Sequence, residues 1–320
     1  MISEKECFFE RDSLAQIETL LCNDSSLIVF DYHSSNSFTL FDLHSGKYIR
    51  RFGAIGSGTG EIPLGCYGFL SKNDFVVYYT HTGLVTKFDI DSLRNGISSS
   101  PNVLCHYEIP EAQFSRIIPI NDTVFVGAGT YKSTYQFLLF DSNNSILDYG
   151  IEIYNADNQS YNEYHKYLSN QGVFTKSPDK NKFVYALNNS SNIDFFEIVD
   201  SKIQLIRSIR IRDPQNKPMS DGPFNGVIPD RDCGIGYIDL TVTDKYVYAL
   251  YTDKKMVDDR GKGNSFSSNV ILVFDWNGNP VEVLQLNQEV YYIAVNEKRN
   301  LIYAAFRYED GGWGITAYGL

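Results

Sequence analysis

The sequence contains no run of 18 or more apolar residues, so no segment is expected to cross a membrane as a helix. The N-terminus, MISEKECFFERDS, has no apolar stretch either and does not resemble a secretory signal peptide. Basic residues are in the minority, because 28 Lys and Arg stand against 39 Asp and Glu and the net charge is −11. This balance argues against a nucleic-acid partner and an anionic membrane surface, since both require clustered Lys and Arg.

Motifs for metal binding and for nucleophilic catalysis are also absent. The cysteines show no C-x-x-C spacing, and we interpret them as buried thiols, with a Cys7–Cys22 bridge as the open alternative. No two of the five histidines are paired at i, i+2 or i+4, so a zinc site is not expected. No serine lies in a G-x-S-x-G motif, which excludes the hydrolase elbow.

Aromatic residues are abundant, with 23 Tyr and 21 Phe, and both types favour half-buried strands. One short pattern recurs along the chain: an alternating strand that ends in Phe-Asp or a close variant, then a turn and another strand. Two further alternating strands precede each copy. The aromatic markers of the six copies are Phe41, Phe88, Phe140, Phe196, Phe274 and, more weakly, Tyr318.

Four antiparallel strands in a unit of about 40–50 residues are typical of a propeller blade. The six markers therefore predict an all-β, six-bladed β-propeller with four-stranded antiparallel blades, as a single domain over residues 1–320. The turns HSGK, SNNS and WNGN carry Gly or Asn where a hairpin needs a positive φ. The acidic residue after each marker is expected to accept backbone N–H bonds in that turn.

The repeat is irregular at its ends and around the fifth blade. The last unit ends after its third strand, and we expect an N-terminal strand within residues 7–20 to complete it and close the ring. Residues 212–236 are rich in Pro and Gly without an alternating strand, which predicts a long loop. A second insertion, residues 254–268, lies inside the fifth blade's hairpin. We expect both insertions to rise on one side and shape a local binding surface.

Two segments resemble a known family. The stretch LFDLHSGKYIRRFGAIGSGTGEI is similar to the first blade of the TolB-like six-bladed propeller proteins of Bacteroides-type bacteria, where an FDL-x-x-GK hairpin runs into FG-x-x-G-x-G-P-G-E. The stretch GYIDLTVTDKYVYALYTDKK, followed by VILVFDWNGNPV, resembles that family's fifth blade. The glycine-rich piece also resembles one NHL repeat. The matching residues of this piece are Gly53, Gly56, Gly58, Gly60 and Glu61, and Thr59 replaces the usual Pro.

The resemblance implies a cell-envelope protein of the periplasm, often a lipoprotein whose leader has been removed, with no established activity. This chain carries neither a lipobox cysteine nor a leader, so a cytoplasmic location stays open.

The glycine-rich stretch GAIGSGTGEI has a second interpretation, as a phosphate-binding loop. A dinucleotide fingerprint needs a helix after the glycines, whereas the sequence continues as the strand-like IPLGCYGF. We therefore favour a blade-to-blade crossover in which Glu61 hydrogen-bonds the loop.

Candidate binding residues come from charges and aromatics near the predicted channel. Arg116 and Asp239 lie inside predicted innermost strands, where a charge either faces the central channel or is paired structurally. Several aromatics lie near the inner edges, where they either bind a ligand or pack blade against blade. The Tyr- and Asn-rich segment 154–169, which contains His165, is either a solvated loop or a loop that holds a sugar or peptide. The candidate residues are Arg116, Tyr237, Asp239, Tyr67, Tyr292 and His165.

These features predict a non-enzymatic binding or protein-interaction module, expected to be a monomer without a cofactor. Its ligand would be a protein, a peptide or an oligosaccharide. The alternative is a calcium-assisted hydrolase or lactonase at the central channel, because some six-bladed propellers hold Ca²⁺ there through Glu, Asn and Asp oxygens. No such set stands out at matching positions in four blades, so we assign no catalytic or metal-binding residue.

Overall fold

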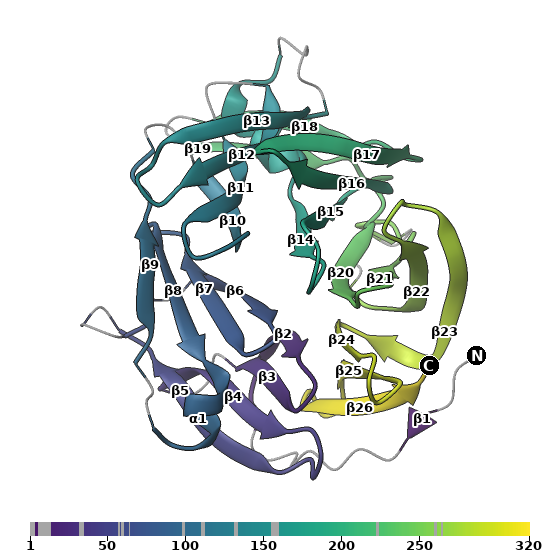
Figure 1. The fold of residues 1–320 in the computed structure, drawn as a ribbon. Coiled ribbons are helices and arrows are strands. Elements are labelled where there is room, and N and C mark those ends of the chain that lie inside the picture. The colour runs from purple at the N-terminus through teal and green to yellow at the C-terminus, as the bar shows by residue number, and fades with distance from the viewer. Residues whose placement is uncertain are drawn as a thin grey trace.

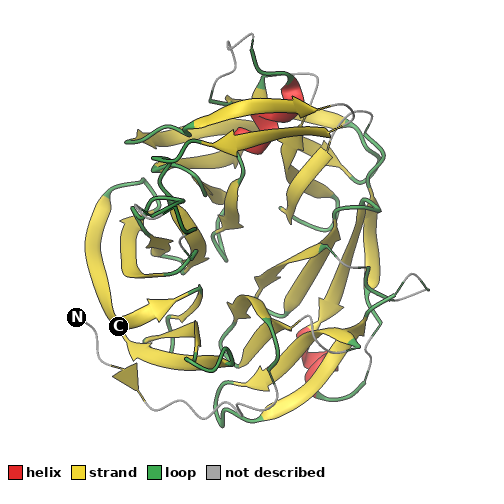
Figure 2. Ribbon diagram, turned by 180° about the vertical axis from the view of Figure 1, so that it is seen from behind, coloured by secondary structure: helices red, strands yellow, loops and turns green. Residues whose placement is uncertain are grey.

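The computed structural model is a ring of six four-stranded antiparallel sheets, which confirms the predicted fold class (Figures 1 and 2). In each blade, the first strand is the innermost (Figure 1). The structure describes residues 4–5, 14–31, 35–56, 58, 61–63, 65–97, 100–109, 113–130, 134–154, 160–221, 224–258, 261–263 and 265–320.

The first three blades follow one another along the chain. The first contains β2 (Ile17–Cys22), β3 (Ser26–Asp31), β4 (Asn36–Asp42) and β5 (Tyr48–Ala54). The second contains β6 (Cys66–Ser71), β7 (Asp74–Tyr79), β8 (Leu84–Asp89) and β9 (Asn102–His106). The third contains β10 (Gln113–Pro119), β11 (Val124–Thr130), β12 (Tyr135–Asp141) and β13 (Ile146–Glu152).

The other three blades complete the ring. The fourth contains β14 (Gly172–Lys176), β15 (Lys182–Leu187), β16 (Asn192–Val199) and β17 (Lys202–Arg210). The fifth contains β20 (Tyr237–Val242), β21 (Tyr246–Tyr251), β22 (Ser268–Asp275) and β23 (Pro280–Val290). The sixth contains β24 (Tyr292–Asn296), β25 (Leu301–Arg307) and β26 (Trp313–Gly319), with β1 (Glu4–Lys5) at its outer edge.

An N-terminal strand closes the ring, but not the segment that the sequence predicted. β1 pairs antiparallel with β26, so the closing residues precede the predicted range 7–20. Residues 17–20 instead belong to β2, the innermost strand of the first blade, where Ile17 and Leu20 pack into its core. Without these residues the first blade would lack its innermost strand, so they pair in the first blade and are not available to complete the sixth. Residues 6–13 lie outside the described ranges.

The marker residues occupy one equivalent place, on the third strand of every blade, and all six are buried. Phe183 and Phe196, for example, stack with ring centroids 5.1 Å apart inside the fourth blade. The following acidic residue binds its turn as predicted: the Asp275 carboxylate accepts hydrogen bonds from the backbone N–H groups of Asn277 and Asn279. Gly278 has a φ of 75°, as the turn chemistry requires.

The first insertion is not a plain loop. Residues 212–236 contain an antiparallel hairpin of β18 (Asn216–Asp221) and β19 (Phe224–Pro229). Its prolines obscured it in the sequence, yet a two-stranded ribbon consists only of edge strands, which tolerate Pro. The hairpin is fastened to α2 (Glu163–Ser169), since Ser169 Oγ donates to Asn216 Oδ1 at 2.8 Å. That helix also corrects the prediction of a loop over residues 154–169.

The two insertions contact each other. Gly234 and Lys255 form an antiparallel bridge, and the Met256 N–H donates to the Cys233 carbonyl at 2.7 Å. A second short helix, α1 (Ile90–Arg94), follows the third strand of the second blade. Within the described ranges, no helix combines the length and the apolar character that crossing a bilayer demands.

The cysteines of the described residues are free thiols. Cys66, Cys105 and Cys233 are buried, as predicted. The Cys22 thiol donates to the Val295 carbonyl at 2.9 Å, so it links the first blade to the sixth. Cys7 lies outside the described residues.

Candidate functional site

A cavity of about 230 Å³ lies inside the ring and is lined by residues from all six innermost strands. Four of the six candidate residues predicted from the sequence meet in its wall. Tyr67 comes from β6, Arg116 from β10, Asp239 from β20 and Tyr292 from β24. The blades thus bring together side chains that are far apart in the sequence.

β-bulges explain how polar side chains reach this cavity. The pairing register of the innermost strand shifts between Ile17 and Thr19, between Phe114 and Arg116, and between Tyr237 and Asp239. In each case the first residue is buried in a blade core and the second lines the cavity. A bulge redirects a side chain that strict alternation would send elsewhere. The shifts occur in the first, third and fifth blades, while β6, β14 and β24 pair regularly.

Arg116 lies flat on an aromatic ring. Its guanidinium carbon is 3.1 Å from the centroid of the Tyr67 ring, which is 39% exposed. Nη1 also donates to the Ser115 carbonyl at 3.0 Å. Such stacking fixes the plane of the cation without neutralising it. Arg116 forms no ion pair with a carboxylate of the described residues.

Asp239 joins two blades and also faces the cavity. Its carboxylate accepts hydrogen bonds from the N–H groups of Ile293 at 2.8 Å and Leu240 at 2.9 Å. Burial raises the pKa of Asp239 to about 7, against the opposite effect of these two bonds and of nearby Arg116. The residue therefore fulfils both roles that the sequence left open, as a structural partner and as part of the channel wall.

Glu18 and Tyr292 form the wall beside Asp239. Glu18 Oε1 accepts from Gln16 Nε2 at 2.5 Å. The Tyr292 ring stacks on Trp313 with centroids 6.2 Å apart. Burial, together with the charges of Glu18 and Asp239, raises the pKa of Tyr292 above its usual range. The phenol thus stays neutral and can donate a hydrogen bond.

Tyr167 on α2 was not predicted as a site residue. Burial raises its pKa, and its hydroxyl hydrogen-bonds the side chains of Ser115 and Gln171 close to the Arg116 charge. The sequence indicated this segment, but with His165 as the candidate residue. His165 is 4% exposed and packs edge-on against Tyr161. Which face of this helix meets the ring depends on how α2 docks, and local sequence carries no signal for that.

Tyr237 is the other candidate that the structure places elsewhere. Its ring is 1% exposed and packs against Tyr251 at a centroid distance of 5.1 Å. Alternation alone would put Tyr237 and Asp239 on one face, and the bulge between them separates the two. Tyr237 therefore contributes to the blade core.

The glycine-rich segment is a crossover between the first and second blades. Ile55 and Ile62 form a parallel bridge across it, and the Gly58 N–H donates to Glu61 Oε2 at 2.7 Å. Gly53, with a φ of 73°, allows the close approach of Ile62 and Phe38. The predicted role of Glu61 in the loop is confirmed.

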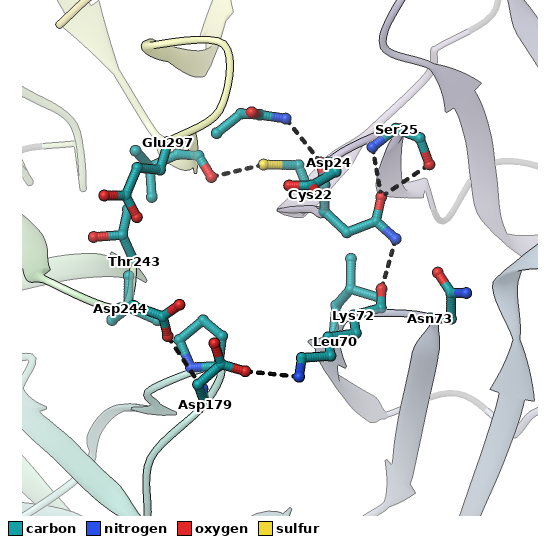
Figure 3. Close-up of a pocket in the computed structure, with 15 residues that line it drawn as sticks. Cys22, Asp24, Ser25, Leu70, Lys72, Asn73, Asp179, Thr243, Asp244 and Glu297 are labelled. Atoms are coloured by element: carbon teal, nitrogen blue, oxygen red, sulfur yellow. Dashed lines mark hydrogen bonds and ion pairs between the residues drawn. The ribbon is translucent and has the colours of Figure 1, made fainter.

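A second cavity, of about 310 Å³, lies where the innermost strands end and turn (Figure 3). Four acidic residues and one lysine face it: Asp24, Asp179, Asp244, Glu297 and Lys72. The turns around it are tied to one another, because Asn23 Nδ2 donates to the Lys72 carbonyl at 2.6 Å and Lys72 Nζ pairs with Asp179 at 2.8 Å. In the described part of the chain, no group of three His, Cys, Asp or Glu side chains could hold a metal ion.

Comparisons with known proteins agree on the architecture. The family model described as TolB-like 6-blade propeller-like matches residues 19–298. The structure is similar to that of a Bacteroides fragilis NCTC 9343 protein described as exported, with a TM-score of 0.58, 13% identity and coverage of 99% of this chain and 94% of that one. It is also similar to the structure of a DUF4221 family member from Bacteroides vulgatus ATCC 8482, with a TM-score of 0.58, 10% identity and coverage of 99% of this chain and 97% of that one. At these identities the likeness shows the fold alone. A search of curated proteins finds no match.

Proposed function

We propose, since this chain belongs to the TolB-like six-bladed propeller family, that it is a non-enzymatic binding protein whose ligand enters the cavity at the start of the innermost strands. One observation carries the proposal: three bulges direct Thr19, Arg116 and Asp239 out of their blades and toward this cavity. Bulges that redirect a side chain are characteristic of functional sites. In folds used for many purposes, function lies in such sites and not in the scaffold.

The composition of the cavity wall suits a small polar ligand. Five aromatic side chains line the cavity, together with a few polar groups that can fix orientation, as in small-molecule sites. A neighbouring cavity of about 360 Å³ shares Ile238 and Tyr292 with the first and extends the available space. Met256 and Phe266 of the insertion 254–268 line this extension, with Gln171 adding an amide. This lining supports the proposal that the insertion 254–268 shapes a local binding surface.

We also propose that the protein works in the cell envelope. The support is the family resemblance and the exported Bacteroides fragilis protein of similar fold. The calcium-assisted hydrolase stays a prediction, and one arm of the following experiment tests it.

The test is a thermal-shift screen of oligosaccharides, short peptides, organic acids and divalent ions on the full chain. We expect at least one organic class to raise Tm, because a ligand that binds only the folded state stabilises it. Tyr67→Ala should weaken that ligand by about tenfold or more, since it removes an aromatic contact. Tyr135→Ala is the matched control, because Tyr135 is 37% exposed and does not line the cavity.

Two results would contradict the proposal. The first is a screen in which no organic class raises Tm, and the second is a ligand that binds Tyr67→Ala and the wild type equally well. Calcium or EDTA should leave Tm unchanged, and a large shift would favour the hydrolase.

A further inference from the structure

Arg116 is the one cationic group in the wall of the first cavity, and most of its hydrogen-bonding capacity is unused among the described residues. A guanidinium has five N–H donors. The structure pairs Arg116 through a single bond from Nη1 to the Ser115 carbonyl. The face of the cation rests on Tyr67, so the donor edges remain for another partner.

Two other arginines of the described residues have close acidic partners, whereas Arg50, Arg212 and Arg299 donate to backbone carbonyls. Arg94 pairs with Asp42 at 2.5 Å and Arg210 with Asp194 at 2.9 Å. Both pairs hold a guanidinium that is only partly exposed, as that of Arg116 is. Unlike Arg94 and Arg210, Arg116 has no carboxylate partner among the described residues.

The acids of the cavity do not fill this role. Both carboxylate oxygens of Asp239 accept backbone N–H bonds, and Glu18 accepts from Gln16. Neither forms an ion pair with Arg116. The position opposite the donor edges of Arg116 is thus available to a ligand.

We infer that the ligand carries a single carboxylate, which the guanidinium of Arg116 binds through two parallel hydrogen bonds while Tyr67 holds its plane. This inference rests on the proposed function and names its ligand class. Guanidinium and carboxylate match in this geometry, and the bond pair fixes direction as well as affinity. One carboxylate fits better than a phosphate, because the chain has a net charge of −11 and two acids already line the cavity.

Two sources can supply such a group: the carboxylate of an acidic sugar and the C-terminus of a short peptide. Both combine the anion with neutral polar groups that Tyr292 and, in the neighbouring cavity, Gln171 can hydrogen-bond. The experiment separates them with two matched pairs of probes. Glucuronate and glucose differ at one carbon, and N-acetyl-alanine and its amide differ only in charge at the terminus.

We expect the charged member of at least one pair to bind the wild type about tenfold more tightly than its neutral partner, measured by titration calorimetry or ligand-detected NMR. Arg116→Gln should weaken that binding by roughly 10- to 100-fold. Arg116→Lys keeps the charge and loses the planar fork, and it should still weaken binding by about fivefold or more. Tm and circular dichroism of each variant establish that it is folded.

Arg307→Gln is the matched control. Arg307 also lies over an aromatic ring, 4.7 Å from the centroid of Trp313, but it does not line the cavity. Its loss should change affinity by less than about twofold. Inorganic phosphate, as a further probe, should bind less well than the preferred carboxylate.

Equal binding of the charged and neutral members of both pairs would overturn the inference, and so would carboxylate binding that survives Arg116→Gln or tighter binding of phosphate. If a neutral ligand binds and is lost in Tyr67→Ala while no carboxylate binds, this inference fails and the proposed function stands. If none of these probes binds, the inference fails, and if the thermal-shift screen also finds no organic ligand, the proposed function fails with it.

Discussion

The two ends of the innermost strands differ in how completely their polar groups are satisfied by the protein itself. At the turn end, neighbouring turns are tied to one another: Asn296 donates to the Asn23 carbonyl, Asn23 to that of Lys72, and Lys72 pairs with Asp179. At the start of the strands, Arg116 has an aromatic ring and one carbonyl for partners. Both ends are polar, so polarity alone does not identify the binding site.

This difference suggests a division of labour. A fully connected polar network rigidifies a structure and leaves little for a ligand to gain. The connections at the turn end run through the sixth, first, second and fourth blades, where the ring must be held closed. The bulged strands at the other end turn Thr19, Arg116 and Asp239 toward the cavity. We therefore propose that the turn end serves stability and the start of the strands serves recognition.

The largest effect expected is a pH dependence of stability at the start of the strands, from Asp239. Its folded pKa, raised to about 7 from 3.8, means that folding favours the protonated form. This contribution is complete below pH 3.8, declines as the pH rises, and is lost above pH 7, a change on the order of a few kcal/mol. The charged and titratable groups facing Asp239 are Arg116, Glu18 and Tyr292.

Denaturant unfolding of the wild type and of Asp239→Asn from pH 4 to 8 measures this change. The free energy of unfolding of the wild type should fall relative to that of the variant as the pH rises. Asp275→Asn is the control, because hydrogen bonds from Asn279 and Asn277 keep the Asp275 pKa below its usual value. The difference in the free energy of unfolding between the wild type and Asp275→Asn should therefore be constant over pH 5 to 8. If the difference in the free energy of unfolding between the wild type and Asp239→Asn did not change with pH, the polar groups at this end of the strands would be as well satisfied as those at the turn end.

The next effect is at the turn end, from Asn23. Its Oδ1 accepts the N–H groups of Ser25 and Ser26, and its Nδ2 ties the turn to Lys72. Asn23→Ala should lower the free energy of unfolding by about 2 kcal/mol, because several hydrogen bonds are lost together. Ligand affinity at the first cavity should not change.

Asn73→Ala is the matched control for this prediction. Asn73 lines the same cavity, but its side chain bonds Asp91 of its own blade. Asn73→Ala should lower the free energy of unfolding clearly less than Asn23→Ala does. If Asn23→Ala weakened the ligand as strongly as Tyr67→Ala does, the separation of the two ends would be wrong.

Much of this fold could be predicted from the sequence because its signals are local and repeated. The turn after Phe274 needs only Asp275, Asn277 and Gly278, and such chemistry is visible in four or five residues. Arg116 and Asp239 stood out because a charge within an apolar strand is anomalous. Four of six candidate residues accordingly line one cavity.

The rest depends on contacts between distant segments. The bulge that separates Tyr237 from Asp239 arises from pairing with β21 and leaves the sequence alternation intact. Tyr167 comes close to Arg116 only because α2 packs against β11 of the third blade and β19 of the hairpin. The hairpin at Asn216 was hidden because Pro residues, which normally signal a loop, also fit an edge ribbon.

The smallest effect on stability is expected from the ion pair between Lys72 and Asp179 at the turn end. It tests whether ion pairs hold the neighbouring turns together. Lys72 Nζ pairs with Asp179, but both side chains are well exposed, and exposed ion pairs contribute little. The Lys72 carbonyl, which accepts from Asn23, is unchanged in Lys72→Met. We therefore expect a small fall in Tm at low salt and none in about 0.5 M NaCl, where screening removes the ion pair.

Lys298→Met supplies the control, because Lys298 forms a similar exposed pair with Asp24, at 3.6 Å, which joins the turns of the sixth and first blades. The two variants should behave alike. A fall in Tm for Lys72→Met as large as that for Asn23→Ala would mean that charge holds the turns together. Because Met keeps an apolar stem of similar length and loses only the charged end, a fall in Tm that persists at high salt would contradict the ionic interpretation of this pair.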